Sequence, residues 1–247
     1  LSRRTLKPIV ANMRAQTEFV QNASHELRTP PAVIQTTGEL LLDSPNSRIV
    51  DRFEDVNAIT SETKRRARLV DNLMELSLGD AGRSSLDASA VNLDALVREA
   101  CGAYEGFATL QDKRLEVETG SRETIEADAD KLRQLLGIVL DNALKYTAPG
   151  DEITVRTRAS GPKQCVVEVA DTGCGIDPED RAHVFGRFYR ADKARSRETG
   201  GYGLGLSLAQ HIVEAHGGSI ALEPNEPRGT VVVVTLPANA SKRVDSL

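Results

Sequence analysis

The chain has 247 residues, which at roughly 100 to 200 residues per domain predicts one large domain or two of moderate size. Hydrophobic residues make up 40% of the sequence and charged residues 27%, proportions that exclude a disordered or collagen-like chain. The net charge of −5 argues against nucleic-acid binding, and three cysteines without CxxC spacing argue against a disulfide scaffold or a zinc ribbon.

The three cysteines, Cys101, Cys165 and Cys174, are expected to be buried small apolar residues in a reducing compartment. No apolar run approaches the ~20 residues that a transmembrane helix needs, and no signal segment opens the chain. Because the chain starts at Leu1 and not at a methionine, we expect it to be cut from a longer protein. Any membrane anchor is then expected in the missing N-terminal region.

Residues 9–78 carry helical patterns that are interrupted once, at residues 43–47, whose composition is that of a turn. In the first arm, steps of four and three residues pass through a mostly apolar series: Ile9, Met13, Gln16, Val20, Ala23, Leu27, Pro30, Ile34, Thr37 and Leu41. The pattern predicts a helical hairpin. Since two helices cannot enclose a core, we expect dimerisation into a four-helix bundle.

A stretch containing Gly and Ser, residues 79–89, predicts a linker. Beyond it, helical patterns alternate with strand patterns, which predicts an α/β sandwich. The helices are expected at Leu93–Leu110 and Ala129–Tyr146, and the strands at Leu115–Val117, Ile153–Arg158, Cys165–Ala170, Ser219–Leu222 and Thr230–Leu236. Residues 171–205 show little periodicity and are too long for an ordinary connection, so we expect a functional lid there.

The first chemical motif is SHELRTP at residues 24–30. His25 lies two residues, or about 200°, from the apolar seam positions on either side, so it is expected to face solvent. A solvent-facing imidazole on a rigid helix can act as a nucleophile. A zinc protease of the HExxH type is excluded, because Thr29 stands where the second ligand would be. Pro30 removes a helical hydrogen bond and predicts a bend after His25.

The second motif, LDNALKY at residues 140–146, lies near the end of the helix that is predicted to start at Ala129. Asn142 offers an amide oxygen to a hard cation such as Mg²⁺, which keeps several waters and takes further oxygens from nucleotide phosphates. Lys145, one turn later, can reach phosphates. Taken alone, the motif is better explained as a helix that has one polar face.

Three further motifs follow the strand predicted at Cys165–Ala170. In DTGCGI, Asp171 can accept a hydrogen bond from an exocyclic amine such as that of adenine, and the glycines admit a flat ring close to the backbone. FGRFYR at residues 185–190 has two guanidinium groups suited to phosphates. GGYGLGL at residues 200–206 opens a helical pattern whose N–H groups form an anion site, although it is neither GxGxxG nor a Walker motif.

In order and spacing, these five motifs resemble those of the sensor histidine kinases of two-component signalling, over residues 14–237. SHELRTP resembles the H box, LDNALKYT the N box, DTGCGI and GGYGLGL the two glycine boxes, and FGRFYRAD the F box. The resemblance implies an all-α hairpin that forms a dimeric four-helix bundle and carries the phosphoacceptor. It also implies a following α/β sandwich that binds ATP, of the gyrase, chaperone and histidine kinase type.

The resemblance implies an ATP- and Mg²⁺-dependent phosphotransferase of a signal-transduction phosphorelay. His25 would receive the γ-phosphoryl group and pass it to an aspartate of a response regulator, with Glu26 as general base. Thr29 would position a water for dephosphorylation of the regulator, and Arg190 would lie near the transferred phosphate. Asn142 is the implied Mg²⁺ ligand. The implied nucleotide contacts are Asn142, Lys145, Tyr146, Asp171, Gly173, Gly175, Gly201, Gly203, Leu204 and Gly205.

The resemblance also predicts the organisation of the chain: the hairpin at residues 1–78, a linker at 79–90, the catalytic domain at 91–238 and a C-terminal tail at 239–247. The expected partners are a second copy of the chain and the receiver domain of a response regulator, with no nucleic acid. The chain is expected to be the cytoplasmic portion of a bacterial protein that is anchored in the inner membrane through its missing N-terminal region.

Three positions depart from the family pattern. Ile138 stands four residues before Asn142, where a second Asn is common, which predicts leaner Mg²⁺ coordination. Pro31 stands where a leucine usually follows the H-box proline, and Tyr202 stands where a small residue is common.

Ile138 also argues against a hydrolytic ATPase of the same fold, since such an enzyme needs a carboxylate at that position to orient water. A protein serine kinase of this fold would have no reason to carry SHELRTP. A nonenzymatic dimeric scaffold would be signalled by lost nucleotide contacts, and Ile138 marks the one visible loss.

Overall fold

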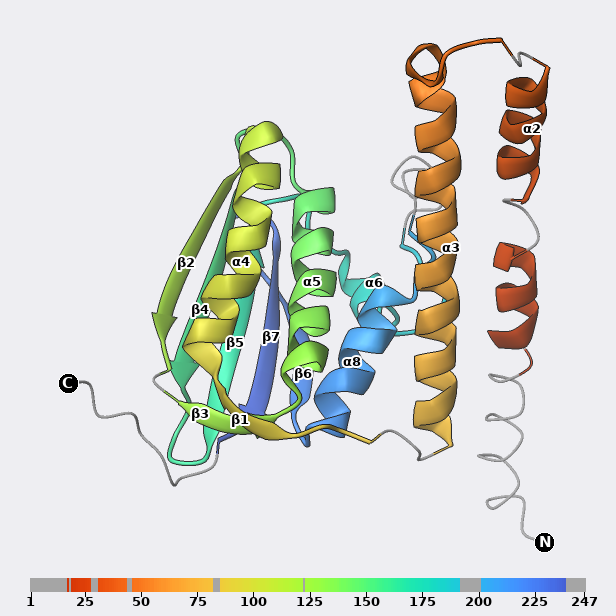
Figure 1. The fold of residues 1–247 in the computed structure, drawn as a ribbon. Coiled ribbons are helices and arrows are strands. Elements are labelled where there is room, and N and C mark those ends of the chain that lie inside the picture. Colours follow the sequence, from red (N-terminus) through yellow and green to blue (C-terminus); the bar gives the residue numbers. More distant parts are fainter. Residues whose placement is uncertain are drawn as a thin grey trace, which may run out of the picture. The chain divides into compact units, whose positions relative to one another are not determined.

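The computed structural model of the chain describes residues 17, 19–27, 31–43, 46–81, 85–121, 123–191 and 201–238. The chain divides into two compact units, Leu1–Ser77 and Leu78–Leu247. Figure 1 shows the helical first unit and the α/β second unit. Each unit is described by itself below.

The first unit is a helical hairpin, as predicted. Residues 19–27 are helical, α2 spans Pro31–Leu42, a 3₁₀ turn (η1) spans Ile49–Arg52, and α3 spans Phe53–Asp80. Residues 28–30, where the sequence predicts a bend, lie outside the described residues. Proline suits the first position of a helix because the N–H of that residue makes no hydrogen bond within the helix that it begins, and Pro31 is the first residue of α2.

Two boundaries in this unit differ from the prediction. The sequence predicted a helical pattern after the turn at residues 43–47, but the second arm opens with the 3₁₀ turn and its α-helix begins only at Phe53. The helix also continues through Gly79 to Asp80, two residues into the predicted linker. Among the described residues, no helix has both the length and the apolar character to cross a bilayer.

The second unit contains two sheets. A small antiparallel sheet pairs β1 (Ser89–Asn92) with β3 (Thr124–Ala127). The main sheet has the order β2-β4-β5-β7-β6, in which β2 and β4 are parallel and the other pairs are antiparallel. Its strands are β2 (Arg114–Gly120), β4 (Glu152–Ala159), β5 (Gln164–Asp171), β6 (Ser219–Pro224) and β7 (Thr230–Pro237).

Three helices lie on one face of the main sheet (Figure 1): α4 (Leu93–Leu110), α5 (Ala129–Tyr146) and α8 (Gly205–Ala215). The predicted α/β sandwich is thereby confirmed. The helix α5 begins where the Asp128 carboxylate accepts hydrogen bonds from the backbone N–H groups of Asp130 and Lys131, both at 3.1 Å. Its leucines at 132, 136 and 140 recur every four residues and are buried, which leaves another face of the helix for polar residues.

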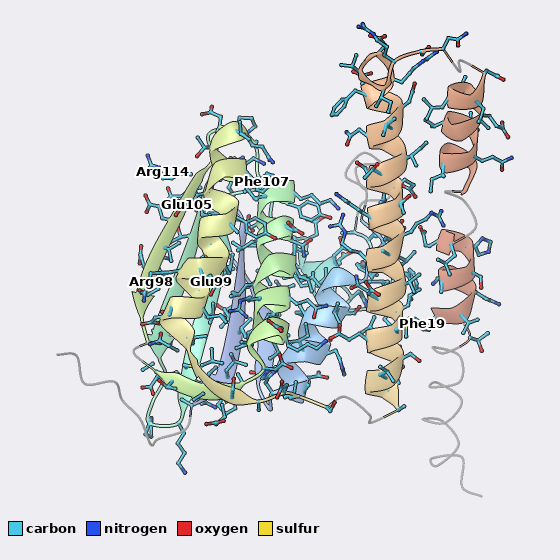
Figure 2. The ribbon with its side chains drawn as sticks, in the orientation of Figure 1. Phe19, Arg98, Glu99, Glu105, Phe107 and Arg114 are labelled. Atoms are coloured by element: carbon cyan, nitrogen blue, oxygen red, sulfur yellow. The ribbon has the colours of Figure 1, made fainter. Side chains whose placement is uncertain are left out.

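An ion pair and a hydrogen bond on the surface of this unit connect α4 to its neighbouring elements. Glu99 of α4 accepts hydrogen bonds from Arg133 of α5, with Nε 3.0 Å from Oε1, and Arg98 donates to the Thr119 hydroxyl of β2. Figure 2 labels Arg98 and Glu99, together with Phe107 near the end of α4. Because such surface pairs contribute only about 0–1 kcal/mol, the apolar layer between helices and sheet holds α4 in place.

The cysteines divide into two groups. Cys101 and Cys165 are fully buried, and burial raises the pKa of each thiol to about 11. Cys174 is exposed, which corrects the expectation that all three are buried. It lies in the turn that follows β5, where the chain leaves the sheet.

Candidate functional site

His25 lies on an exposed position of the helical residues 19–27, so its predicted solvent exposure is confirmed. The neighbouring hydroxyl of Ser24 donates to the carbonyl of Val20 at 2.8 Å and is thus engaged within its own helix. Glu26 is half-buried. Thr29, the residue predicted to position a water, lies outside the described residues. The chemical roles of these residues stay predictions.

In the second unit, the end of α5 presents three of the predicted nucleotide contacts. Asn142 and Lys145 are half-buried and Tyr146 is exposed, and their spacing of three and four residues places them on one side of the helix. The Lys145 ammonium lies 5.1 Å from the centroid of the Tyr146 ring, within the range of a cation–π contact. The helix end therefore presents one cation and one amide beside an aromatic ring.

Asp171 ends β5 and is buried, with 7% of its surface exposed. Its Oδ1 accepts hydrogen bonds from the backbone N–H groups of Gly173 at 2.9 Å and Thr230 at 3.3 Å. Its Oδ2 accepts none from the residues that the structure describes. Burial raises the pKa of this carboxyl group, and the negative charge of Asp151 raises it further, while the two hydrogen bonds oppose the rise. One oxygen is thus fixed and the other remains available for a ligand.

The turn after Asp171 packs directly on the end of α5. A Cβ atom added at Gly173 would lie 2.2 Å from the carbonyl oxygen of Tyr146, so only glycine fits. The backbone N–H of Cys174 donates to the same oxygen at 3.2 Å. The close packing at Gly173 thereby places Asp171 near Tyr146, although the two residues were predicted from separate motifs.

The turn between β6 and β7 contributes residues that the sequence analysis missed. The Asn225 side-chain amide donates to the Asp171 carbonyl at 2.8 Å, and Gly229, at a φ of +117°, would place a Cβ atom 1.9 Å from that carbonyl oxygen. Thr230 binds the Asp171 carboxylate through its N–H. Gly229 also packs against Gly175, whose added Cβ would lie 3.3 Å from the Gly229 oxygen. Gly229, directly before the last predicted strand, was the one local signal for this contact.

The glycine-rich motif before α8 lies beside the end of α5. A Cβ atom added at Gly201 would be 3.0 Å from the Lys145 ammonium, and one at Gly205 would be 3.2 Å from a side-chain carbon of Ile138. Leu204 is buried at the start of α8, where no side chain caps the helix. The first N–H groups of α8 are therefore available for an anion.

The F-box motif packs against the same glycines. Gly203 has a φ of +71°, and a Cβ atom there would lie 2.6 Å from the backbone carbonyl oxygen of Tyr189 and 2.8 Å from the carbonyl carbon of Phe188. Phe188 itself has a φ of +60°, which is unusual for a residue other than glycine. A cavity of about 480 Å³ is lined in part by Phe188, Arg187 and Arg190. The Nη2 atom of Arg190 is buried and has no hydrogen-bond partner among the described residues.

These features fit ATP with Mg²⁺. The free Oδ2 of Asp171 suits an exocyclic amine such as that of adenine, and the charges of Lys145 and Arg190 and the N–H groups at the start of α8 suit phosphates. Among the described residues, no group of three or more His, Cys, Asp and Glu side chains could hold a metal ion. Mg²⁺ usually keeps several waters and takes phosphate oxygens as ligands, and the amide oxygen of Asn142 is its predicted protein ligand here.

Comparison with known proteins decides the family. The domain described as His Kinase A (phospho-acceptor) matches residues 15–82, and the Histidine kinase-, DNA gyrase B-, and HSP90-like ATPase domain matches residues 127–240. The Sensor protein CiaH of Streptococcus pneumoniae serotype 4 is 37% identical over 236 residues, 96% of this chain and 52% of CiaH. The chain belongs to the sensor histidine kinases.

A second relative of this sensor histidine kinase is the signal transduction histidine-protein kinase ArlS of Staphylococcus aureus strain USA300, 36% identical over 232 residues, 91% of this chain and 49% of ArlS. The chain thus spans about half the length of the curated relatives it matches. The structure of histidine kinase ThkA in complex with response regulator TrrA aligns with a TM-score of 0.65 over 98% of this chain and 66% of that one. At 23% identity, it shows the fold alone.

The family predicted from the five motifs is confirmed, and so is the order of a helical hairpin and an ATP-binding α/β domain. The H box of this histidine kinase lies within the matched phosphoacceptor domain. The N box, both glycine boxes and the F box lie within the matched ATPase domain. The roles of single residues in these boxes remain predictions that mutation has to test.

Proposed function

We propose that this chain is the catalytic portion of an ATP-dependent protein histidine autokinase. It transfers the γ-phosphoryl group of ATP to His25 and then passes that group to an aspartate of a response regulator. The observation that carries the proposal is an exposed histidine, followed by a half-buried carboxylate, on the helix of the matched phosphoacceptor domain. The two domain matches and the sensor-protein relatives support the same activity.

Nucleotide binding is proposed to use the residues that meet at the end of α5. Asp171 accepts from the adenine amine through Oδ2, and Gly173 and Gly175 let the turn after Asp171 pack closely against Tyr146 and Gly229. Lys145 and the N–H groups at the start of α8 hold the phosphates, with Gly201, Gly203 and Leu204 shaping the backbone there. When bound, Mg²⁺ supplies positive charge to the phosphate oxygens, and Asn142 contributes an amide oxygen to it.

In the transfer step, a lone pair on one imidazole nitrogen of His25 forms a bond to the γ-phosphorus as the bond from that phosphorus to the β,γ-bridging oxygen breaks, and ADP leaves. Glu26 accepts a hydrogen bond from the other imidazole N–H, which stabilises the imidazolium as it develops, and as general base it then takes that proton to leave a neutral phosphohistidine. Arg190 and Lys145 offset negative charge on the transferred group. Since acceptor and nucleotide belong to different units, the step requires that the two units approach each other.

The proposal includes two protein partners. Apolar side chains of the hairpin are exposed in the single chain, among them Val20 at 57%, Phe53 at 66% and Met74 at 59%, and a second copy would cover such surface in a four-helix bundle. The receiver domain of a response regulator would dock near His25. The complex of ThkA with response regulator TrrA, a protein of the same fold, supports this pairing. The chain spans about half the length of its curated relatives, which supports the proposal that it is part of a longer sensor protein.

The proposed autokinase activity is tested by incubating the chain with γ-labelled ATP and Mg²⁺. We expect label that is acid-labile and alkali-stable, as a phosphorus–nitrogen bond requires. His25→Gln should abolish labelling and leave ATP binding intact, while the matched control Ser24→Ala should be labelled like the parent, since its hydroxyl bonds its own helix. Labelling of His25→Gln at the parent rate would contradict the proposal.

We further propose that the chain dephosphorylates its response regulator. Thr29 follows His25 by four residues in the motif, the spacing that places two side chains on one helix face, and its hydroxyl can orient a water for attack on the phosphoaspartate. Thr29→Ala should remove most of the phosphatase activity and spare autophosphorylation. If both activities fall together, Thr29 supports the helix near Pro30 and has no separate chemical role.

A further inference from the structure

The segment after His25 contains two consecutive prolines, Pro30 and Pro31. In an α-helix, the carbonyl of residue 27 accepts a hydrogen bond from the N–H of residue 31. Leu27 and Pro31 are both helical here, but proline has no N–H. Whatever the path of residues 28–30, which lie outside the described residues, the carbonyl of Leu27 therefore cannot receive this bond from residue 31.

The structure provides a different donor for this carbonyl. Arg66, on the other arm of the hairpin, donates from Nη1 to the Leu27 oxygen at 3.0 Å, across 39 residues of sequence. Both residues belong to the first unit. A backbone carbonyl without a partner is costly, and a hydrogen bond from a charged group is stronger than one from a neutral group. The contact connects α3 to the helix that carries His25.

The surroundings of Arg66 indicate that this bond is its main polar contact. The side chain is only 18% exposed, and its Nε lies 3.5 Å from Glu62 Oε1 on the same helix. Its Nε and Nη2 atoms make no hydrogen bond to the residues that the structure describes. A guanidinium group held away from water with few partners is unfavourable, so the Leu27 carbonyl is a valuable acceptor for it.

We propose that Arg66 is a positioning residue for the phosphoacceptor His25, because it replaces the hydrogen bond that Pro31 cannot make and so holds the end of the helix on which His25 lies. The inference rests on the proposed function of His25. Leu27 is two residues from His25, so a change in the path of the chain at Leu27 moves the imidazole. Displacement of a reacting group by about 1 Å can lower a rate on the order of 100-fold.

The proposal is tested with a double-mutant cycle in the full chain. Arg66→Met removes the donor and keeps the apolar stem, and Arg66→Lys keeps one donor. Pro31→Leu supplies a backbone N–H at residue 31, and we expect this N–H to take over the Leu27 carbonyl and make the Arg66 bond dispensable. Arg68→Met is the matched control, because Arg68 lies on the same helix and is exposed.

At saturating ATP, we expect Arg66→Met to slow phosphorylation of His25 roughly tenfold, the factor that corresponds to about 1.4 kcal/mol. The affinity for ATP should be unchanged, since the nucleotide contacts lie in the other unit. Arg66→Lys should recover most of the rate, and Arg66→Met in the Pro31→Leu background should lose less than about twofold. An equal loss in both backgrounds, an equal loss in Arg68→Met, or no loss in Arg66→Met would overturn the proposal.

A second measurement separates this inference from the proposed function. Amide hydrogen exchange at residues 21–27 should speed up roughly tenfold in Arg66→Met with Pro31 present, and change little in the Pro31→Leu background. This readout needs no phosphorylation, so it tests the hydrogen bond even if His25→Gln is still labelled. Exchange that responds as expected without any change in the phosphorylation rate would overturn the positioning role. Exchange that is insensitive to both substitutions would overturn the hydrogen bond itself.

Discussion

Replacing Asp171 by asparagine separates ligand recognition from stability at the nucleotide site. The substitution keeps an oxygen that can accept the N–H groups of Gly173 and Thr230 and replaces Oδ2, the proposed acceptor of the adenine amine, by an NH₂ donor. Loss of a hydrogen bond to a charged group costs about 1.5–3 kcal/mol, so the Kd for ATP should rise roughly 10- to 150-fold. GTP should lose less affinity, because its base carries a carbonyl where adenine carries the amine.

The same variant should not be less stable than the parent at pH 7. Burial raises the pKa of Asp171 above its ordinary value of 3.8, so the folded state binds this proton more tightly than the unfolded state does. The ionised carboxylate therefore costs stability at pH values above its raised pKa, and this cost disappears as the pH falls below the ordinary value. The asparagine side chain of the variant carries no such charge, so the unfolding free energy of Asp171→Asn at pH 7 should equal or exceed that of the parent.

Calorimetric titration with ATP and GTP, together with urea unfolding of the ligand-free protein at pH 7 and at acidic pH, measures both effects. Glu223→Gln is the matched control, because it removes one negative charge from an exposed position of the same sheet. In the parent, ATP binding should also weaken on acidification as Asp171 takes up its proton. If both nucleotides bind Asp171→Asn as they bind the parent, the carboxylate is a turn residue and does not recognise adenine.

Two further substitutions test the geometry around this site. Gly173→Ala places a Cβ atom 2.2 Å from the backbone carbonyl oxygen of Tyr146, so it should lower both the melting temperature and the ATP affinity. The control Gly102→Ala, at an open position of α4, should stabilise the protein by about 1 kcal/mol. Thermal melts and calorimetry measure the contrast, and equal effects of the two substitutions would argue against the close approach at Gly173. Lys145→Met should weaken ATP binding much more than adenosine binding, since the ammonium lies beside Gly201 in the proposed phosphate site. If calorimetric titrations show equal losses of affinity for ATP and adenosine, Lys145 does not contact the phosphates.

Local signals in the sequence predicted the elements of the α/β unit well. The helices at Leu93–Leu110 and Ala129–Tyr146 were predicted with the bounds that the structure shows, because each has strong periodicity and a capping side chain, that of Asn92 or Asp128, directly before it. The strands β1 and β3 were missed. Each has only four residues, and a run that short carries no clear alternation of its own.

The residues that were missed act over long distances in sequence. Asn225 and Thr230 contact Asp171 across 54 and 59 residues, and no local pattern states that their turn folds back onto the end of β5. The same holds for Arg66, which reads in the sequence as one cation in a polar stretch of a helix. Its contact with Leu27 depends on how the two arms of the hairpin pair. Motifs thus identified the candidate chemistry, while the residues that hold it in place required the fold.

The most direct test of the account is to locate the phosphate on the protein. The chain is incubated with ATP and Mg²⁺, digested at neutral pH to preserve acid-labile bonds, and its peptides are sequenced by mass spectrometry. The account predicts a single phosphorylated residue, His25, in the peptide that contains SHELR. A phosphate on serine or threonine, or conversion of ATP to ADP without any phosphate on the protein, would contradict it.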